Sequence, residues 1–244
     1  VDLSGGFTQL TDFDFAGNTL TYLDLSGCSA LTYINPLGTG NLSYFNIRGC
    51  SSITTFNITS STLSFIDFTG CTALNNLSIW NSLLTALDFS NQPCQTINLQ
   101  DNNQMTSITF GNNPNLSNLN VLGGPITTID VSSLPALSSF WCANHPLLQT
   151  IYAKNGANES LVLGNNPNLD FVCVDDSQVS AVRTYLDGNS MANVACSSYC
   201  SFTPGGNYNT IAGNMKFDVN NNGCDAGDIT PNNIRVNITD GTNT

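Results

Sequence analysis

A loop near the end of the chain carries the residues best suited to bind a metal ion. Residues 218–228 read DVNNNGCDAGD, with oxygen-bearing side chains at alternate positions before Gly223. This order opens many calcium loops, because alternate oxygens converge on the ion and glycine permits the sharp turn. The alternative is an Asn-rich turn whose side chains bond their own backbone. We expect a Ca²⁺ site whose ligands are Asp218, Asn220, Asn222, Asp225 and Asp228. The loop lacks the Glu that completes the twelve-residue calcium loop of an EF-hand.

The nine cysteines fall into two groups. Five occupy positions in a repeat where a small buried side chain fits, and we expect them to stay reduced: Cys28, Cys50, Cys71, Cys94 and Cys142. The first three form a column, which leaves cross-coil disulfides as an alternative there. The other four lie beyond the regular repeat. Cys173 faces outward on the last coil and Cys196 follows a predicted helix that can return to that coil, so we predict the disulfides Cys173–Cys196 and Cys200–Cys224.

Three aromatic residues are candidates for ligand binding. Trp141 and Tyr152 take outward positions of the repeat, and Trp80 lies just past its strand. Exposed aromatic side chains often mark recognition surfaces. The alternative for Trp141 is packing beneath a loop or a terminal cap. His145, the only histidine, precedes Pro146 at a turn position, which favours a role in the turn.

A column of outward carboxylates offers the only catalytic chemistry in the repeats. It contains Asp24, Asp67, Asp88 and Asp130, interrupted by Asn46 and Thr109. A polysaccharide-acting enzyme needs an acid/base pair or a metal cluster in a cleft. Within residues 1–168 the only cations are Arg48 and Lys154. We therefore expect no enzyme, and interpret the column as water-screened, with a cation or basic-ligand site as the alternative.

These residues are positioned by a repeat. The frame Leu20-x-x-Leu23-x-Leu25-x-x-Cys28 returns at Leu42 and at Leu63. The residue between the last two apolar positions recurs with a step of 21 or 22 residues, through Asp24, Asn46, Asp67, Asp88, Thr109, Asp130, Tyr152 and Cys173. A second series, through Asp14, Asn35 and Trp141, lies between these. Two half-repeats thus make one coil of about 21 residues, the short end of the leucine-rich-repeat range.

The repeat predicts a mainly β leucine-rich-repeat solenoid over residues 1–168, with eight coils (168/21). Each apolar–x–apolar triplet is a short strand that points its apolar residues inward. One coil cannot bury its apolar edge alone, so neighbouring coils must stack around a shared core.

Most half-repeats carry Thr or Ser at their second position, as at Thr32, Ser43 and Ser138. The simpler interpretation is a hydroxyl that bonds the turn backbone or its neighbour one coil away. The alternative is a flat hydroxyl array that binds ice. Such arrays usually need two Thr flanking an inward residue, whereas here the hydroxyl stands at the start of the strand.

Residues 169–200 break the period and predict a cap with one helix. The segment DDSQVSAVRTYLDG offers Asp175 or Asp176 as N-cap, an apolar stripe and Gly188 as a stop. Such a helix would cover the open strand edge of the last coil. Residues 201–244 contain two strand-like segments and predict the first strands of an immunoglobulin-like β-sandwich, truncated at Thr244, because two strands cannot bury a core alone.

Composition limits the function classes. The net charge is −12 and only 9% of the residues are charged. An acidic surface repels phosphate backbones, so we expect no nucleic-acid partner. No apolar run is long enough for a membrane span. Val1 opens in the middle of the pattern, so we interpret the chain as an excised or mature fragment.

The repeats resemble leucine-rich repeats of large secreted flavobacterial proteins. The junction LDFVCVDDSQVSAV, then YCSFTPGGNYNTIAGNMKFDVNNNGCD, is similar to the segment that joins such repeats to an immunoglobulin-like domain. The 218–228 loop resembles loops of B-type domains in bacterial surface proteins. The resemblance implies a secreted or cell-surface module of a type IX-secreted protein, with the secretion machinery as a partner. The expected function is adhesin-like binding of a protein or glycan ligand.

Overall fold

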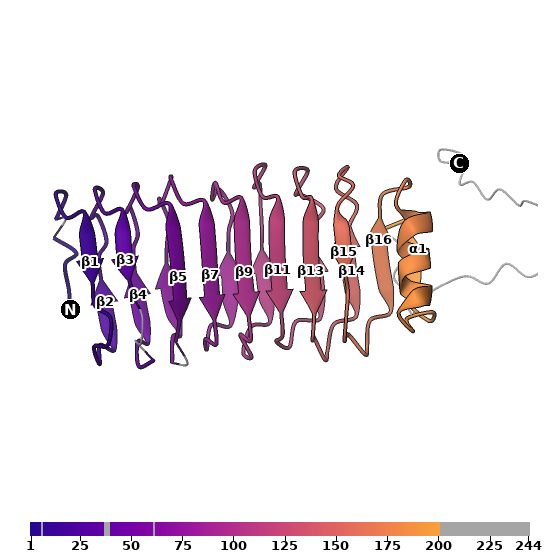
Figure 1. Ribbon diagram of the computed structural model, residues 1–244, viewed down its shortest axis with the longest axis horizontal. Coiled ribbons are helices and arrows are strands. Elements are labelled where there is room, and N and C mark those ends of the chain that lie inside the picture. The colour runs from indigo at the N-terminus through magenta and orange to yellow at the C-terminus, as the bar shows by residue number, and fades with distance from the viewer. Residues whose placement is uncertain (6, 37–39, 61, 201–244) are drawn as a thin grey trace, which may run out of the picture. The chain divides into compact units, whose positions relative to one another are not determined.

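The computed structural model describes residues 1–5, 7–36, 40–60 and 62–200. The chain divides into two compact units, Val1–Pro204 and Gly205–Thr244. Every described residue lies in the first unit, which is a parallel β-solenoid of about nine coils followed by one short helix (Figure 1). The predicted sandwich strands of residues 201–244 and the predicted calcium ligands lie outside the described residues.

Each regular coil contributes two short strands, so the solenoid has two faces. Face A consists of β1 (Asp12–Asp14), β3 (Tyr33–Asn35), β5 (Thr55–Thr59), β7 (Asn76–Trp80), β9 (Thr96–Gln100), β11 (Asn118–Leu122), β13 (Ser139–Ala143) and β15 (Ser160–Val162). Face B consists of β2 (Tyr22–Asp24), β4 (Tyr44–Asn46), β6 (Phe65–Asp67), β8 (Ala86–Asp88), β10 (Ser107–Thr109), β12 (Thr128–Asp130), β14 (Thr150–Ala153), β16 (Phe171–Val174) and β17 (Ala195–Ser197). The strands of face A form a row along the solenoid in Figure 1.

All strand pairs are parallel, and each joins equivalent residues of successive coils. Face A is a continuous ladder from β5 to β15, and β1 pairs with β3. Face B is divided into β2-β4-β6, β8-β10 and β12-β14-β16-β17. Among the described strands, the ladder is therefore interrupted between β3 and β5 on face A, and at β6/β8 and β10/β12 on face B. The interruption between β3 and β5 lies beside the candidate site.

The core lies between the two faces and confirms the predicted frame. Leu23 and Leu87 are buried and Ile66 is half-buried. Phe68, Phe89 and Phe110 stack in successive coils, with ring centroids 5.5 and 6.1 Å apart. Fully burying such side chains stabilises the fold by about 1.5–3 kcal/mol each. Stacking the coils achieves this burial, which one coil could not achieve alone.

The corners depend on residues with a left-handed backbone, which stand directly before the residue that enters the ladder. Glycine adopts positive φ without strain, and Asn and Asp adopt it more readily than other residues. These corner positions are Gly17, Gly27, Gly49, Gly70, Asn81, Asn91, Asp101, Gly123, Asn144 and Asn165. The requirement explains the abundance of Gly and Asn in a chain with short turns.

Several of the residues that follow these corner positions bind backbone groups of the preceding coil through their side chains, and we call them ladder residues. Cys50 Sγ donates to Leu25 O and Cys71 Sγ donates to Ile47 O, each at 3.2 Å. At other corners an amide does the same, since Asn166 Nδ2 donates to Cys142 O at 3.0 Å. A buried carbonyl without a partner would cost stability, so Cys and Asn at this position are structural.

The cap is the helix α1 (Val179–Gly188), which buries Val182 and Leu186. The predicted N-cap is wrong, because the helix begins after a turn and Gln178 occupies the N-cap position without a side-chain cap bond. The Asp175 carboxylate instead accepts the backbone N–H groups of Asn155 and Gly156, at 3.1 and 2.9 Å. After α1 the chain returns as β17, which pairs with β16 and covers the last edge of face B.

Candidate functional site

The two tryptophans of the chain both stand on face A. Trp80 ends β7 with 41% of its surface exposed, and Trp141 lies in β13 with 48% exposed. Strand alternation places them outward, because their neighbours Ile79, Phe140 and Cys142 point into the core. Large exposed aromatic side chains on a regular sheet contribute nothing to the core, so they are the first candidates for contact with a ligand.

A groove of about 530 Å³ lies beside Trp80, at the interruption between β3 and β5. Tyr33 of β3 lines one side, with 53% of its surface exposed. Outward side chains of β5 line the other side, namely Thr55, Asn57 and Thr59. The wider separation of β3 from β5 is visible in Figure 1. The groove thus combines two aromatic rings with hydroxyl and amide groups.

Trp80 also lines a second, smaller hollow of about 220 Å³ over β9 and β11. Asn98, Gln100 and Asn120 supply its polar groups. Two of these are held in a row, because Asn120 Nδ2 donates to Asn98 Oδ1 at 2.5 Å and Asn98 Nδ2 donates to Ser78 Oγ at 3.2 Å. Trp80 therefore lines both hollows.

Both hollows are electrically neutral. No Asp, Glu, Lys, Arg or His is among the described residues that line them. The polar groups of the described lining residues are amides, hydroxyls and the Tyr33 phenol, which can exchange hydrogen bonds with a ligand.

Tyr152, the third predicted binding residue, lies on the opposite face. It belongs to β14 and borders a hollow of about 340 Å³ with Asp130, Ser132 and Cys200. Because the faces point in opposite directions, one ligand cannot contact the outer surface of both at these positions. The structure brings Trp80 and Trp141 to one surface and does not bring Tyr152 to it.

Sequence reasoning missed the aromatic residues that precede the inward positions. Tyr33 is one of them, and the others stack along face B. Rings of Tyr22 and Tyr44, and of Tyr44 and Phe65, lie 4.4 Å apart with interplanar angles of 12° and 5°. The signal was the recurrence of an aromatic residue at Tyr22, Tyr33, Tyr44 and Phe65 in the same frame. On face B the rings are mutually packed, whereas Tyr33 faces the groove.

The carboxylate column closes turns. Each carboxylate accepts the backbone N–H group two residues later at 2.8–2.9 Å: Asp24 from Ser26, Asp67 from Thr69, Asp88 from Ser90 and Asp130 from Ser132. These bonds lower the pKa of Asp88, because they favour its charged form. The side chains therefore satisfy backbone donors as Asx turns do. No group of three or more metal-binding side chains occurs in the part of the chain that the structure describes.

The predicted disulfides are wrong, since Cys173 is bonded to Cys200 and Cys196 is free. β17 pairs with β16 in a register that sets Ser197 beside Cys173 and Cys196 beside Val172. Adjacent residues of a strand point to opposite faces, so Cys196 lies against the core. Cys200 then takes the position over Cys173, with the two Cα atoms 5.3 Å apart. Because Cys200 is bonded to Cys173, the predicted disulfide Cys200–Cys224 does not form. Cys224 itself lies outside the described residues.

The prediction of five reduced cysteines is confirmed: Cys28, Cys50, Cys71, Cys94 and Cys142 are buried and free. Burial raises the pKa of the Cys50 and Cys71 thiols to about 12. Both therefore remain protonated at neutral pH and act as donors in the ladder. A buried protonated thiol is a poor nucleophile, which makes this column a structural feature.

The hydroxyls of the half-repeats also bond the neighbouring coil, as the simpler interpretation predicted. Thr32 Oγ1 donates to Thr11 O at 3.1 Å, and Ser138 Oγ donates to Ser117 O at 2.9 Å. The same contact recurs for Ser43, Ser64, Thr106 and Ser117. A hydroxyl that donates to a backbone carbonyl keeps only its acceptor lone pairs for water.

His145 is a ladder residue, which confirms the predicted turn role. Its ring is fully buried, with Nε2 2.9 Å from Val121 O and Nδ1 3.2 Å from Gly124 O. Burial lowers the pKa of His145, although the two carbonyls act in the opposite direction. The imidazole is thus enclosed by backbone and is not accessible to a substrate.

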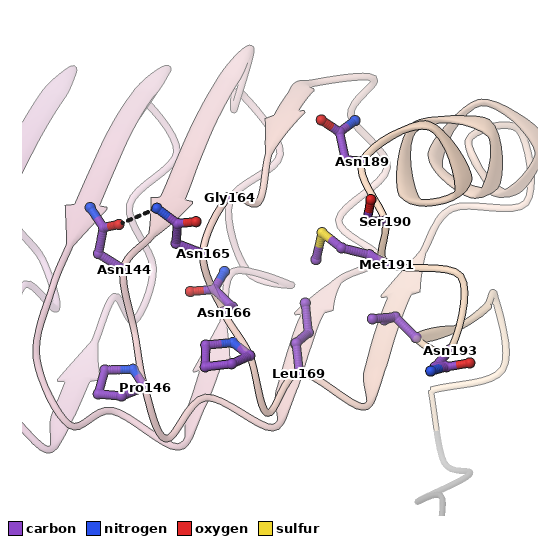
Figure 2. A pocket seen from close by; sticks show the side chains of 12 residues that line it. Asn144, Pro146, Gly164, Asn165, Asn166, Leu169, Asn189, Ser190, Met191 and Asn193 are labelled. Carbon is purple, nitrogen blue, oxygen red and sulfur yellow. Dashed lines mark hydrogen bonds between the residues drawn. The ribbon is translucent and has the colours of Figure 1, made fainter.

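Another hollow lies between the last corners of the solenoid and the segment after α1 (Figure 2). It measures about 710 Å³, and no aromatic or charged side chain is among the described residues that line it. Asn165 Nδ2 donates to Asn144 Oδ1 at 3.0 Å across adjacent corners. Asn166 Nδ2 donates to Cys142 O, and Asn189 Nδ2 donates to Tyr185 O at 2.7 Å. The amides here stabilise corners and the helix end, so we rank this hollow below the groove at Trp80.

One carboxylate is buried beneath the cap. Glu159 accepts a hydrogen bond from Gln178 Nε2 at 3.1 Å, and Asn155 Nδ2 lies 3.5 Å from its other oxygen. Burial raises the pKa of Glu159, with the nearby Asp175 charge adding to the effect. The group joins the start of the cap to the last coils and does not reach either hollow at Trp80.

Comparison with known proteins adds no identity: no protein-family model, no curated protein and no solved structure matches this chain. None of the helices in the described residues is long and apolar enough to cross a membrane.

Proposed function

We propose that this chain is a non-catalytic binding module of a secreted or cell-surface protein, and that face A carries its ligand site. The observation that supports the proposal is the placement of Trp80 and Trp141 on one polar face, whose strands from β3 to β15 contain no charged residue. A ligand-binding surface needs large amphipathic side chains at its centre and polar groups around them. Face A offers both, through its tryptophans and its rows of Asn, Ser and Thr.

The disulfide Cys173–Cys200 supports an extracytoplasmic location, because disulfides persist mainly in oxidising compartments. The finer assignment is part of the proposal: a leucine-rich-repeat region of a flavobacterial protein exported by type IX secretion, joined to an immunoglobulin-like domain. It rests on the repeat spacing and the junction sequence. The calcium site at 218–228 remains a prediction within that assignment. The outlined function is adhesin-like attachment to a protein or a glycan.

A binding screen tests the proposal. The fluorescently labelled chain would be applied to printed glycans and to immobilised extracellular proteins. We expect at least one ligand, whose binding falls at least tenfold in the double variant W80A/W141A. The matched control is Y22A, since Tyr22 is 40% exposed and lies on face B.

Two outcomes would overturn the proposal: no ligand among the printed glycans and proteins, or a ligand whose binding the double variant retains in full. Circular dichroism of each variant shows whether the solenoid remains folded. Release of reducing ends from a bound polysaccharide would instead favour the enzyme alternative.

A further inference from the structure

The position of Trp80 between two hollows indicates the shape of the ligand. The groove lies over β3 and β5, the smaller hollow lies over β9 and β11, and Trp80 of β7 lines both. The register sets Thr59, Trp80 and Gln100 side by side across three strands. A ligand that fills both hollows must therefore be elongated, cross the strands, and pass over the indole ring.

The dimensions suit a chain of a few sugar rings. Neighbouring strands are about 4.8 Å apart, so the run from β3 to β11 extends over roughly 20 Å. A pyranose ring advances an extended glycan by a length similar to one strand spacing. Successive rings could thus meet the same kind of polar group at each strand, with Trp80 near the middle of the run.

The chemistry of the lining favours a carbohydrate over a peptide. Each face of a pyranose presents C–H groups that pack on an aromatic ring, and its edge presents hydroxyls that need donors and acceptors. Trp80 and Tyr33 supply the rings. Asn57 supplies an amide, and Thr55 and Thr59 supply hydroxyls. None of these three side chains makes a hydrogen bond within the described residues. Ile34 and Pro36 add apolar surface on the β3 side of the groove. The outward side chains of β5 are all polar, which suits the hydroxyls of a sugar better than the apolar side chain of a peptide anchor.

Charge excludes the acidic glycans. Among the described residues, neither hollow contains a cationic side chain, and the whole chain carries a net charge of −12. A uronic acid or sulfated polymer would approach a surface of its own sign and find no counter-charge. The ligand that fits is uncharged.

We propose that Trp80 is the central platform of a site for a neutral oligosaccharide, which runs across face A from the β3–β5 groove to the β9–β11 hollow. This inference rests on the proposed function of face A and names its ligand class. Trp80 stacks on one ring, Tyr33 on a ring in the groove, and Asn57 bonds the hydroxyls between them.

Because the chain has only two tryptophans, fluorescence can report on Trp80 alone. In the full-length variant W141F, Trp80 is the only tryptophan and position 141 keeps an aromatic ring. The probes are hexasaccharides of cellulose, mannan, xylan, chitin and laminarin. We expect at least one to shift the emission of Trp80 to shorter wavelength and to protect it from quenching by acrylamide, because stacking removes water from the indole.

Calorimetry on the natural chain and its variants measures the contribution of each group. For the oligosaccharide that binds, we expect W80A to raise Kd at least tenfold, W80F to raise it less, and N57A to raise it several-fold. Y22A, of matched exposure on face B, should bind as the natural chain does. Heparin and polygalacturonate should not compete.

The outcomes separate the ligand class from the binding function. If none of the five hexasaccharides binds, or if Trp80 fluorescence is unchanged at saturation, the inference is wrong. If an immobilised protein binds in a Trp80-dependent manner and no oligosaccharide competes, the binding function of face A holds and the glycan assignment fails. Competition by heparin would overturn the neutral class.

Discussion

At the scale of single residues, the chain uses unlike side chains for one task. Cys50, Asn102 and His145 occupy equivalent corner positions and each contacts backbone carbonyl oxygens of the preceding coil. What these side chains share is a hydrogen-bond donor at a similar distance from the corner. This explains why the only histidine of the chain is enclosed by backbone rather than exposed to a ligand.

His145 should make stability depend on pH. Burial lowers its pKa below the ordinary value of 6.5. As pH falls below 6.5, the unfolded chain takes up the proton first, so stability is full above that pH and declines as pH falls through the lower folded-state pKa. The slope approaches about 1.4 kcal/mol per pH unit.

The comparison is with H145N, which keeps an amide donor at the corner and does not titrate. Urea unfolding at pH 7, 6 and 5 should show a steeper loss for the natural chain than for H145N. The raised pKa of Glu159 affects both proteins equally. Parallel stability curves would show that His145 does not titrate differently on folding.

At the scale of elements, the corner columns decide how well neighbouring coils are joined. Asn102 accepts hydrogen bonds from Ser82 N at 3.0 Å and Ser82 Oγ at 2.7 Å, and donates to Ile79 O at 3.0 Å. Asn113 is equally buried, but its amide has no partner among the described residues. Asn therefore stabilises the fold at position 102 and destabilises it at position 113.

Leucine substitutions at these two positions should have opposite effects. N102L leaves Ser82 N and Ile79 O without partners, which costs about 1–3 kcal/mol for each buried group. N113L removes two unpaired polar atoms, and Leu134 already occupies the equivalent position one coil later. We expect N113L to stabilise the fold by about 1 kcal/mol or more.

Equilibrium denaturation of both variants tests this pair. The natural chain should lie between them in midpoint. A loss of stability in N113L as large as that in N102L would show that Asn113 is hydrogen-bonded in solution, for example to an internal water molecule.

The sequence predicted the strands and their inward residues better than it predicted which strands and side chains lie beside one another. Spacing alone placed Leu23 and Leu87 inside, because strand alternation is a local property. It failed for Cys196, since the face on which that residue lies depends on the register of β17 against β16. It also missed the groove, because Tyr33 and Trp80 lie far apart in the chain and line one groove only where the ladder between β3 and β5 is interrupted.

At the scale of the whole solenoid, stability is local. Strand pairs join only successive coils, so each coil depends on the two beside it. The cap stabilises the last coils through α1, β17 and the disulfide. Arg183 reinforces this end, because its guanidinium donates to Val194 O at 2.6 Å and to Asp187 at 2.7 Å.

Removing the disulfide should therefore loosen one end only. The bond joins residues 27 apart, for which loop-closure entropy gives about 3–4 kcal/mol. In C173S/C200S, hydrogen exchange should accelerate in β16, α1 and β17, while β5, β7 and β9 keep their protection. The control C196S alters a free thiol and should retain the natural exchange pattern at the cap. Faster exchange that reaches β5 would show that the solenoid unfolds as one unit.

Among the described strands, the interruptions of the two ladders are staggered along the solenoid. Opposite the β3–β5 interruption, β4 and β6 remain paired, and opposite β6–β8 and β10–β12 the face A ladder is intact. The successive coils at each interruption are therefore still joined by strand pairing on the other face. An oligosaccharide in the groove beside Trp80, as proposed above, would add contacts between β3 and β5, where the face A ladder is interrupted. We therefore expect ligand binding to stabilise this junction in particular.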